Sequence, residues 1–176
     1  MTNLQMLLAL GAMMLLTILL LNVNRNSLAV EDVMYDSNFG ITATSIASSI
    51  IEDASKKRFD KVTAEYDPTD STYTAVYDPT YFTPAGSLGI DSGEVITDPK
   101  TFNDFDDYDN YATVDSTMPS AVFSVLCKVN YVNETALDDS VNTQTFHKKI
   151  TVRVWSKSMS DTIVISSIYS YWNFLP

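Results

Sequence analysis

The stretch that decides the fold runs from Leu4 to Leu21 and reads LQMLLALGAMMLLTILLL. Only Gln5, Gly11 and Thr17 interrupt its large apolar and alanine side chains, and no charged residue occurs between residues 1 and 24. Leu, Met and Ala are good helix formers, and the stretch contains no proline, so it predicts an α-helix. This helix would be about 27 Å long at ~1.5 Å per residue, close to the ~30 Å hydrocarbon core of a bilayer. The stretch therefore needs lipid or another apolar surface around it.

The helical pattern continues beyond this stretch. Residues 27–34 return to an amphipathic pattern, and residues 41–57 carry an apolar stripe at spacings of three and four. We expect one long helix from about residue 3 to residue 58, with local loosening near residues 22–26 or 37–40. The apolar stripe, which we expect to pack on the rest of the protein, consists of Ala43, Ile46, Ala47, Ile50 and Ala54.

Residues 59–176 are predicted to form a β-rich head. Its last part contains three β-rich runs, AVFSVLCKVNYV at 121–132, TFHKKITVRVW at 145–155 and TIVISSIYSYW at 162–172. In the second run Ile150, Val152 and Val154 alternate with polar residues, which is typical of a half-buried strand. Turn-rich connections between the runs favour an antiparallel meander. A sheet needs a cover for its apolar face, so the fold class is α+β: a long N-terminal helical spine packed on a C-terminal antiparallel β-sheet.

Long loops are expected in residues 67–118, because Asp, Thr, Tyr and Pro are frequent there. Two short strands are predicted at residues 62–66 and 73–77. Each is followed by an Asp-Pro-Thr turn, at residues 67–69 and 78–80. This near-repeat predicts a hairpin or a pair of similar edge strands.

The composition excludes several classes of function. The net charge is −11 and no basic stripe exists, which excludes nucleic acid as a partner. Cys127 is the only cysteine, so no intrachain disulfide can form, and we read Cys127 and the single histidine, His147, as strand residues. No phosphate loop, zinc spacing or Ser/His/Asp arrangement occurs, so neither an enzyme nor a cofactor is expected.

Two short motifs would carry a ligand or a modification. Residues 104–109 contain a carboxylate cluster of the kind that binds Ca²⁺, with Asp104, Asp106 and Asp109 as the candidate ligands. Asp109 stands where an EF-hand loop needs glycine, so the preferred interpretation is a solvated acidic loop without a metal. The sequence Asn133-Glu134-Thr135 is an N-glycosylation sequon with Asn133 as its acceptor.

Three interpretations of the N-terminal block compete: a secretory signal peptide, a plain membrane anchor and the core helix of a filament. A signal peptide would have positive charges ahead of the apolar run, and residues 1–3 have none. A plain anchor is often joined to its head by a Pro/Gly/Ser linker, whereas here the helical pattern continues. The third interpretation therefore fits the sequence best.

The N-terminal segment resembles the type IV pilins, whose mature chains begin with an apolar residue and an apolar helix that is charged only at its fifth position. The start MTNLQML, residues 1–7, aligns with that pattern without gaps. Gln5 stands where the family has glutamate, so it cannot supply the charge that pairs with a neighbour's N-terminal amine. The resemblance covers roughly residues 1–58, and it implies that Met1 is a processed, N-methylated start.

The resemblance implies a structural subunit of an extracellular, type IV pilus-like filament with a role in adhesion or surface interaction. Its partners would be copies of itself in a helical polymer, the inner membrane before assembly, and an assembly ATPase with its platform. Residues 1–24 would form the transmembrane segment and later the filament core. A membrane-anchored extracytoplasmic binding domain, or a minor pilin or pseudopilin of a secretion system, is the alternative. The residues assigned to the core and its assembly contacts are Met1, Leu4, Gln5, Met6, Leu7, Leu8, Leu10, Met13, Met14, Leu15, Leu16, Ile18 and Leu19.

Overall fold

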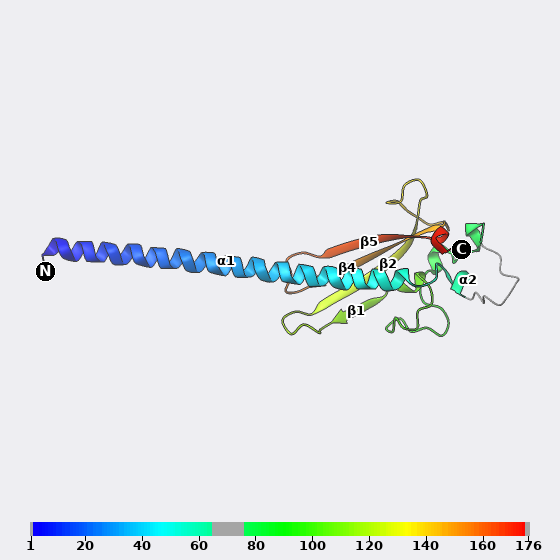
Figure 1. Ribbon diagram of the computed structural model, residues 1–176, viewed down its shortest axis with the longest axis horizontal. Helices are drawn as coiled ribbons and strands as arrows, with labels where there is room; N and C mark the ends of the chain where they lie inside the picture. Colours follow the sequence, from blue (N-terminus) through cyan, green and yellow to red (C-terminus); the bar gives the residue numbers. More distant parts are fainter. Residues whose placement is uncertain (1, 65–75, 175–176) are drawn as a thin grey trace. The chain divides into compact units, whose positions relative to one another are not determined.

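The computed structural model describes residues 2–64 and 76–174 and contains both helices and a sheet (Figure 1). The chain divides into two compact units, residues 1–39 and residues 40–176. The α-helices and β-strands, in chain order, are α1 (Asn3–Ser55), α2 (Lys61–Ala64), β1 (Ala112–Asp115), β2 (Phe123–Val132), β3 (Ser140–Val141), β4 (His147–Ser156) and β5 (Ile163–Ser170).

Helix α1 begins with a reciprocal cap formed by Thr2 and Gln5. The Gln5 N–H donates to the Thr2 carbonyl at 2.9 Å, and the Gln5 Oε1 accepts from the Thr2 N–H at 3.1 Å. Such a cap satisfies donors that the first helical turn leaves unpaired. The helix ends at Ser55, slightly before the predicted end at residue 58, and Lys56 and Lys57 donate to carbonyls three residues back.

The predicted loosening of α1 near residues 22–26 or 37–40 is wrong, because both stretches are regular α-helix. Neither contains proline, and a single Gly such as Gly40 costs only about 1 kcal/mol relative to Ala. Continuing a helix is much easier than starting one, so a penalty of this size does not interrupt it.

The sheet is antiparallel, with the strand order β1-β2-β4-β5 and β3 paired with the end of β2. The three predicted strands are present as β2, β4 and β5, which confirms the predicted antiparallel meander. The register places Cys127 opposite Val152, and Val152 opposite Ile165. Strands β1 and β3 lie in stretches that were predicted to be loops or turns.

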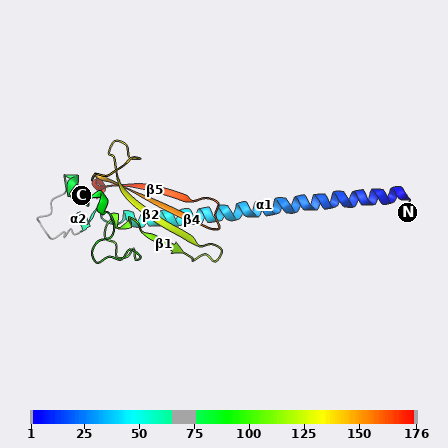
Figure 2. The same cartoon turned by 180° about the vertical axis from the view of Figure 1, so that it is seen from behind.

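From Gly40 onward, α1 lies along one face of this sheet, and no described helix covers the opposite face (Figures 1 and 2). On the stripe of α1, Ala43, Ala47 and Ala54 are fully buried, and Ile46 and Ile50 are half-buried. Small side chains allow the helix to approach the sheet closely. The α+β fold class, with the helix packed on the sheet, is therefore confirmed. The strand side chains on the covered face include Phe123, Val125, Cys127, Val129, Tyr131, Ile150, Val152 and Val154, each at most 1% exposed.

The strand predicted at residues 62–66 is wrong for its described part, because Lys61–Ala64 form the single helical turn α2. Asp60 starts this turn: its Oδ1 accepts from the Val62 N–H at 3.3 Å, and its carbonyl accepts from the Thr63 N–H at 2.8 Å. The capping bonds of Asp60 therefore favour a helical turn over a strand here. The rest of that strand, the turn at residues 67–69 and most of the strand at residues 73–77 lie outside the described residues.

The loop between the helices and the sheet has an aromatic core of its own. Phe82 packs at ring-centroid distances of 5.0 Å from Phe59 and 5.2 Å from Tyr171, and Phe105 stacks on Tyr169 at 4.6 Å. The predicted turn at residues 78–80 is present as part of a 3₁₀ turn, whereas the adjoining residues 76–77 are not in a strand. Buried rings thus order this loop despite its lack of regular structure.

Candidate functional site

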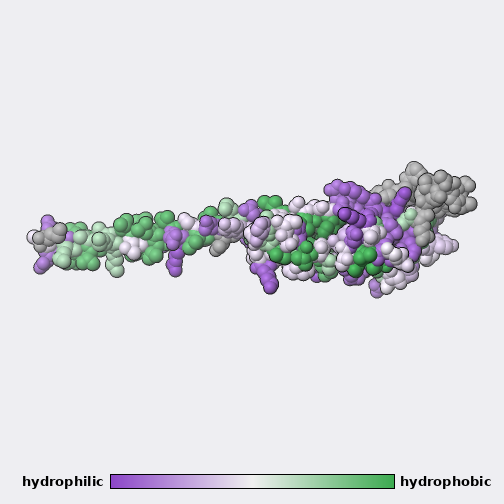
Figure 3. Space-filling model, turned by 90° about the horizontal axis from the view of Figure 1, so that it is seen from below, coloured by the Kyte–Doolittle hydropathy of each residue, from purple (hydrophilic) through white to green (hydrophobic). Residues whose placement is uncertain are grey.

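The first candidate site is the apolar segment of α1, defined here as residues 4–21. Nothing in its compact unit covers it: its Leu, Ile and Met side chains are between 51% and 72% exposed. Figure 3 shows the surface of this segment as mostly hydrophobic. Met1 lies outside the described residues, and the other residues predicted for the core all lie on this segment.

A helix with this composition does not stay exposed to water. Its most apolar 18-residue window has a mean hydropathy of 2.4. Burying each large aliphatic side chain is worth roughly 1.5–3 kcal/mol relative to water. By length and composition this single described helix could cross a membrane, although a signal sequence near an N-terminus would satisfy the same test.

The polar side chains within the apolar segment have partners in their own chain. The Thr17 hydroxyl donates to the Met13 carbonyl at 2.8 Å, and Gln5 accepts from the Thr2 N–H in the cap described above. These bonds reduce the cost of placing polar groups in an apolar surrounding. The segment can therefore enter lipid or a bundle of helices without further hydrogen-bond partners for these two oxygen atoms.

A shallow groove on the apolar segment is lined by Leu4, Leu7, Leu8, Gly11, Ala12 and Leu15. Gly11 and Ala12 are the smallest residues that line this groove. A Cβ added at Gly11 would meet no atom within 4 Å, so the groove is open. Small residues on apolar helices let a second helix approach closely, which makes this groove a candidate contact for another helix.

The second candidate site, a charge cluster inside the head, was not predicted. Lys148 lies near the start of β4 and is fully buried. Its Nζ donates to the Phe59 carbonyl at 2.8 Å, to Asp60 Oδ2 at 2.7 Å and to Asp106 Oδ1 at 2.5 Å. The Phe59 and Tyr131 ring centroids lie 4.7 Å and 5.2 Å from the same nitrogen. Protein groups therefore accept from all three hydrogens of the ammonium.

Asp60 is held in place by donors from three segments of the chain. The Thr83 N–H donates to its Oδ2 at 3.0 Å, and the Tyr131 hydroxyl lies 3.3 Å from the same oxygen. The Thr83 hydroxyl and the Val62 N–H donate to Oδ1 at 3.1 Å and 3.3 Å. Asp60 thereby connects the segment after α1 to the loop and to β2.

The acidic stretch at residues 104–109 is not the solvated loop that the sequence predicted. Its four aspartates are at most 4% exposed. Asp107 Oδ2 accepts from two backbone N–H groups at 2.8 Å and 3.0 Å, and Asp109 binds the Lys128 ammonium at 2.8 Å. Hydrogen bonds from the backbone and from lysines thus allow carboxylates to be buried that the sequence alone assigned to water.

The three candidate calcium ligands do not share one centre. Asp106 pairs with Lys148, Asp109 pairs with Lys128, and Asp104 Oδ1 accepts from the Asp106 N–H at 2.9 Å. Within residues 2–64 and 76–174, no group of three or more His, Cys, Asp or Glu side chains is arranged to hold a metal ion.

Burial changes the acidity of these aspartates. Desolvation, followed by the nearby Asp106 charge, raises the pKa of Asp104 to about 10, so Asp104 is protonated at neutral pH. Desolvation also raises the pKa of Asp106, against the effect of Lys148. The pKa of Asp107 rises to about 7, mainly through desolvation and in part through Glu94. Protons are therefore held inside the head at neutral pH.

The sequence does contain a signal for Lys148. It stands two, four and six residues before Ile150, Val152 and Val154, so it has the same strand phase as the buried side chains. A lysine in that phase must point into the core. Its partners, however, lie 42 and 88 residues away in sequence, which no local pattern reveals.

No protein family, curated protein or solved structure matches the chain. The architecture itself, a long N-terminal apolar helix packed on an antiparallel sheet, is compatible with a pilin-like fold.

The remaining candidate residues lie apart from these sites. Cys127 is fully buried on β2 opposite Val152, and burial raises the pKa of its thiol to about 12. His147 is the first residue of β4, where it is paired with Ser170 of β5. Asn133 is half-buried at a turn, where its Oδ1 accepts from the N–H and the hydroxyl of Thr135. N-glycosylation of Asn133 stays a prediction.

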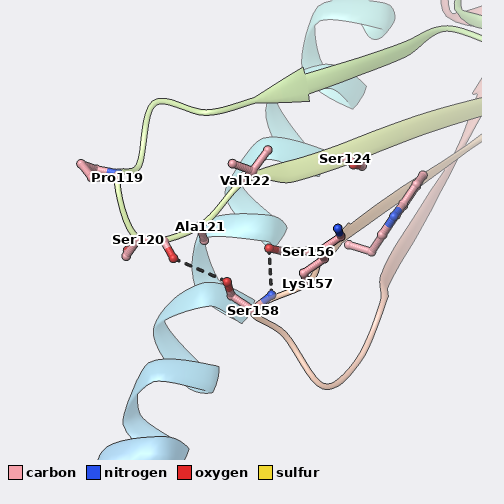
Figure 4. A pocket seen from close by; sticks show the side chains of 9 residues that line it. Pro119, Ser120, Ala121, Val122, Ser124, Ser156, Lys157 and Ser158 are labelled. Carbon is pink, nitrogen blue, oxygen red and sulfur yellow. Dashed lines mark hydrogen bonds between the residues drawn. The ribbon is translucent and has the colours of Figure 1, made fainter.

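The head also has a surface pocket of about 450 Å³ at one end of the sheet (Figure 4). Its polar groups are mostly serines, and the Ser158 hydroxyl donates to the Ser120 carbonyl at 3.5 Å. None of its lining side chains is a histidine, cysteine or carboxylate that could activate a serine. We assign no reaction to this pocket. It is lined by Pro119, Ser120, Ala121, Val122, Ser124, Trp155, Ser156, Lys157 and Ser158.

Proposed function

We propose that this protein is a structural subunit of an extracellular, type IV pilus-like helical filament with a role in adhesion or surface interaction. The apolar segments of many copies would pack together in the filament core, and the heads would form the outer surface. The observation that supports the proposal is the exposed apolar segment, which has no charged side chain and no cover in its compact unit.

In this proposal the bilayer stores the subunit until the filament core replaces the lipid. Leaving lipid for a helical bundle gains little hydrophobic energy, because lipid tails are as apolar as leucine. Close packing must therefore stabilise the core, and an external motor must extract the subunit. The resemblance to type IV pilins implies a cytoplasmic ATPase and a membrane platform for this work. A head-to-tail contact that does not close into a ring then produces a helical polymer.

Because position 5 is glutamine, the apolar segment would bring no charged side chain into the proposed filament core. In type IV pilins a glutamate at this position pairs with the N-terminal amine of a neighbour. Gln5 has no charge to offer, and its oxygen already accepts from the Thr2 N–H. Cohesion in the core would accordingly come from apolar packing around Gly11 and Ala12 more than from an ion pair.

The test is electron microscopy of material sheared from the cell surface, combined with a Gly11→Leu variant and a Leu10→Met control. Gly11→Leu keeps the segment apolar and meets nothing in its own chain, so membrane insertion should be unchanged. We expect wild type and Leu10→Met to form filaments that contain this chain. We expect Gly11→Leu to accumulate in the membrane with a severalfold loss of filaments.

The same experiment tests the alternative of a single-span, membrane-anchored binding domain, which the length and hydropathy of α1 also favour. An anchor would give the chain in the membrane fraction and no filaments in any variant. That result would contradict the proposed function. Filaments in which this chain is present at only a few copies would instead point to a minor pilin.

A further inference from the structure

Inside the head, one buried lysine lies between two buried aspartates and next to two aromatic rings. We call Lys148, Asp60 and Asp106 the lysine–aspartate box. The Lys148 ammonium is 2.7 Å from Asp60 and 2.5 Å from Asp106, and the three side chains are at most 3% exposed. The rings of Phe59 and Tyr131 complete its walls.

Keeping these charges in the interior is unfavourable. Ions that leave water lose their hydration, and a buried pair repays this loss only partly. The box also contains two carboxyl groups and only one lysine. Any reaction that removes one positive and one negative charge from this place would therefore relieve the cost of desolvation.

We propose that the Lys148 amine and the Asp60 side chain condense into an intramolecular amide bond, so that the head carries a covalent link between the segment after α1 and strand β4. The reaction forms a bond between Lys148 Nζ and Asp60 Cγ and breaks one Cγ–O bond of Asp60. The two protons that the ammonium loses combine with the departing oxygen, and one water molecule leaves. One positive and one negative charge disappear together, so atoms and charge balance, and no oxidant or further reactant is needed.

Each residue of the box has a role in this step. Asp106 is placed to take a proton from the ammonium, which frees the amine lone pair for attack. The Thr83 N–H lies 3.0 Å from Asp60 Oδ2, where it would stabilise the negative charge that develops during attack. The Tyr131 hydroxyl, 3.3 Å from the same oxygen, donates its hydrogen to the Thr83 carbonyl at 2.8 Å. Asp106 then returns its proton to the departing oxygen.

Two further features support the reaction. Burial raises the pKa of Asp106, which makes its carboxyl group a better proton acceptor toward the ammonium that it contacts. The folded chain also holds the amine and the carboxyl group within hydrogen-bond distance, and such fixed proximity corresponds to a very high effective concentration. Folding alone would thus be sufficient to start the condensation.

The bond would give the head a type of cross-link that its composition otherwise lacks. With Cys127 as its only cysteine, the chain can form no intrachain disulfide. An amide between residues that are 88 positions apart would close a long loop and would not be broken by reducing agents. It would form whether or not the chain assembles into filaments, so its test is independent of the proposed function.

The test is mass spectrometry of the full-length wild-type protein under denaturing, reducing conditions. We expect an intact mass lower than the sequence mass by one water molecule. After digestion with trypsin, we expect a branched peptide that joins Lys148 to Asp60, with no cleavage after Lys148. An intact mass equal to the sequence mass, with normal cleavage after Lys148, would overturn the proposal and leave a simple ion pair.

Variants identify the atoms involved. Asp60→Ala removes the carbon that is attacked, and Asp106→Asn removes the proton acceptor, so both should retain the full sequence mass. Lys149→Arg is the matched control, since Lys149 is only half-buried and its ammonium donates to the Asp138 carbonyl, away from the box, so this variant should lose water like the wild type. Loss of water within an unbranched peptide, as in a cyclised aspartate, or a link from Lys148 to Asp106, would also refute the proposed bond. The wild-type mass decides the question even where a variant does not fold.

Discussion

A single residue, Lys148, organises the interior of the head. Its ammonium binds a carbonyl and two carboxylates, and these groups have no access to water. The residue is the point at which the segment after α1, the turn at residues 106–108 and strand β4 meet.

Lys148→Met should therefore destabilise the head strongly. Removing one partner of a buried pair typically costs about 3–5 kcal/mol, because the other charge is left uncompensated. The measurement is urea unfolding of the full-length protein in detergent, followed by tryptophan fluorescence. Lys149→Met should change the free energy of unfolding by no more than about 0.5 kcal/mol, since Lys149 is not in the core. Equal effects of both substitutions would contradict the importance assigned to the buried cluster.

Asp107 should make the stability of the head depend on pH. Its pKa in the folded head is about 7, above its ordinary value of 3.8, so the folded state binds the proton more tightly than the unfolded state. This contribution is complete below about pH 4 and is lost as pH rises through about 7, with a slope of at most about 1.4 kcal/mol per pH unit.

Urea midpoints at pH 5, 6, 7 and 8 measure this dependence. The midpoint of the wild type should fall as pH rises. Asp107→Asn should reduce the slope between pH 5 and 7, because asparagine stays neutral and can still accept from the same backbone N–H groups. A wild type that becomes more stable as pH rises over this range would contradict the assignment.

Secondary structure elements were predictable where one physical signal dominated. The uncharged run of α1 consists of good helix formers without proline, and β4 has the two-residue alternation of a strand, and both elements are present. The turn at α2 was missed because the capping oxygens of Asp60 outweighed the strand preference of Val62 and Thr63.

The functional sites were predictable to different degrees for the same reason. The apolar segment is a local property of the sequence, and it can be recognised without knowledge of the fold. The burial of residues 104–109 depends on N–H groups and lysines that only the fold brings close. The sequence does not indicate whether an aspartate is solvated or paired with a lysine that is distant in sequence. The lysine–aspartate box could therefore not be predicted.

The contact between α1 and the sheet depends on small side chains. Ala47 is 0% exposed, because it lies on the face of α1 that packs on the sheet. The adjacent Ser48 is exposed. Ala47→Leu should cost about 1–3 kcal/mol through overpacking, and Ser48→Leu should cost much less. Thermal unfolding of both variants in detergent measures the difference. A larger effect at Ser48 would refute the packing of this face.

At the scale of the whole molecule, the two compact units should differ in their need for an apolar surrounding. Residues 40–176 contain the sheet and its core, whereas residues 1–39 contain the apolar segment. A fragment that lacks residues 1–39 should stay dispersed in detergent-free buffer, and the full-length chain should associate. Sedimentation velocity of both proteins measures this. A full-length chain that is a dispersed monomer without detergent would argue against an uncovered apolar segment.

The buried position of Cys127 makes this thiol a natural reporter of opening events in the head. Because the side chain is inaccessible and the pKa of the thiol is about 12, a maleimide can modify it only while the sheet is separated from its cover. With one cysteine in the chain, the labelling rate would report how often the head opens, without any engineered probe. The same measurement could be made on the protein in detergent and in lipid vesicles, so the effect of the surroundings on the head becomes directly measurable.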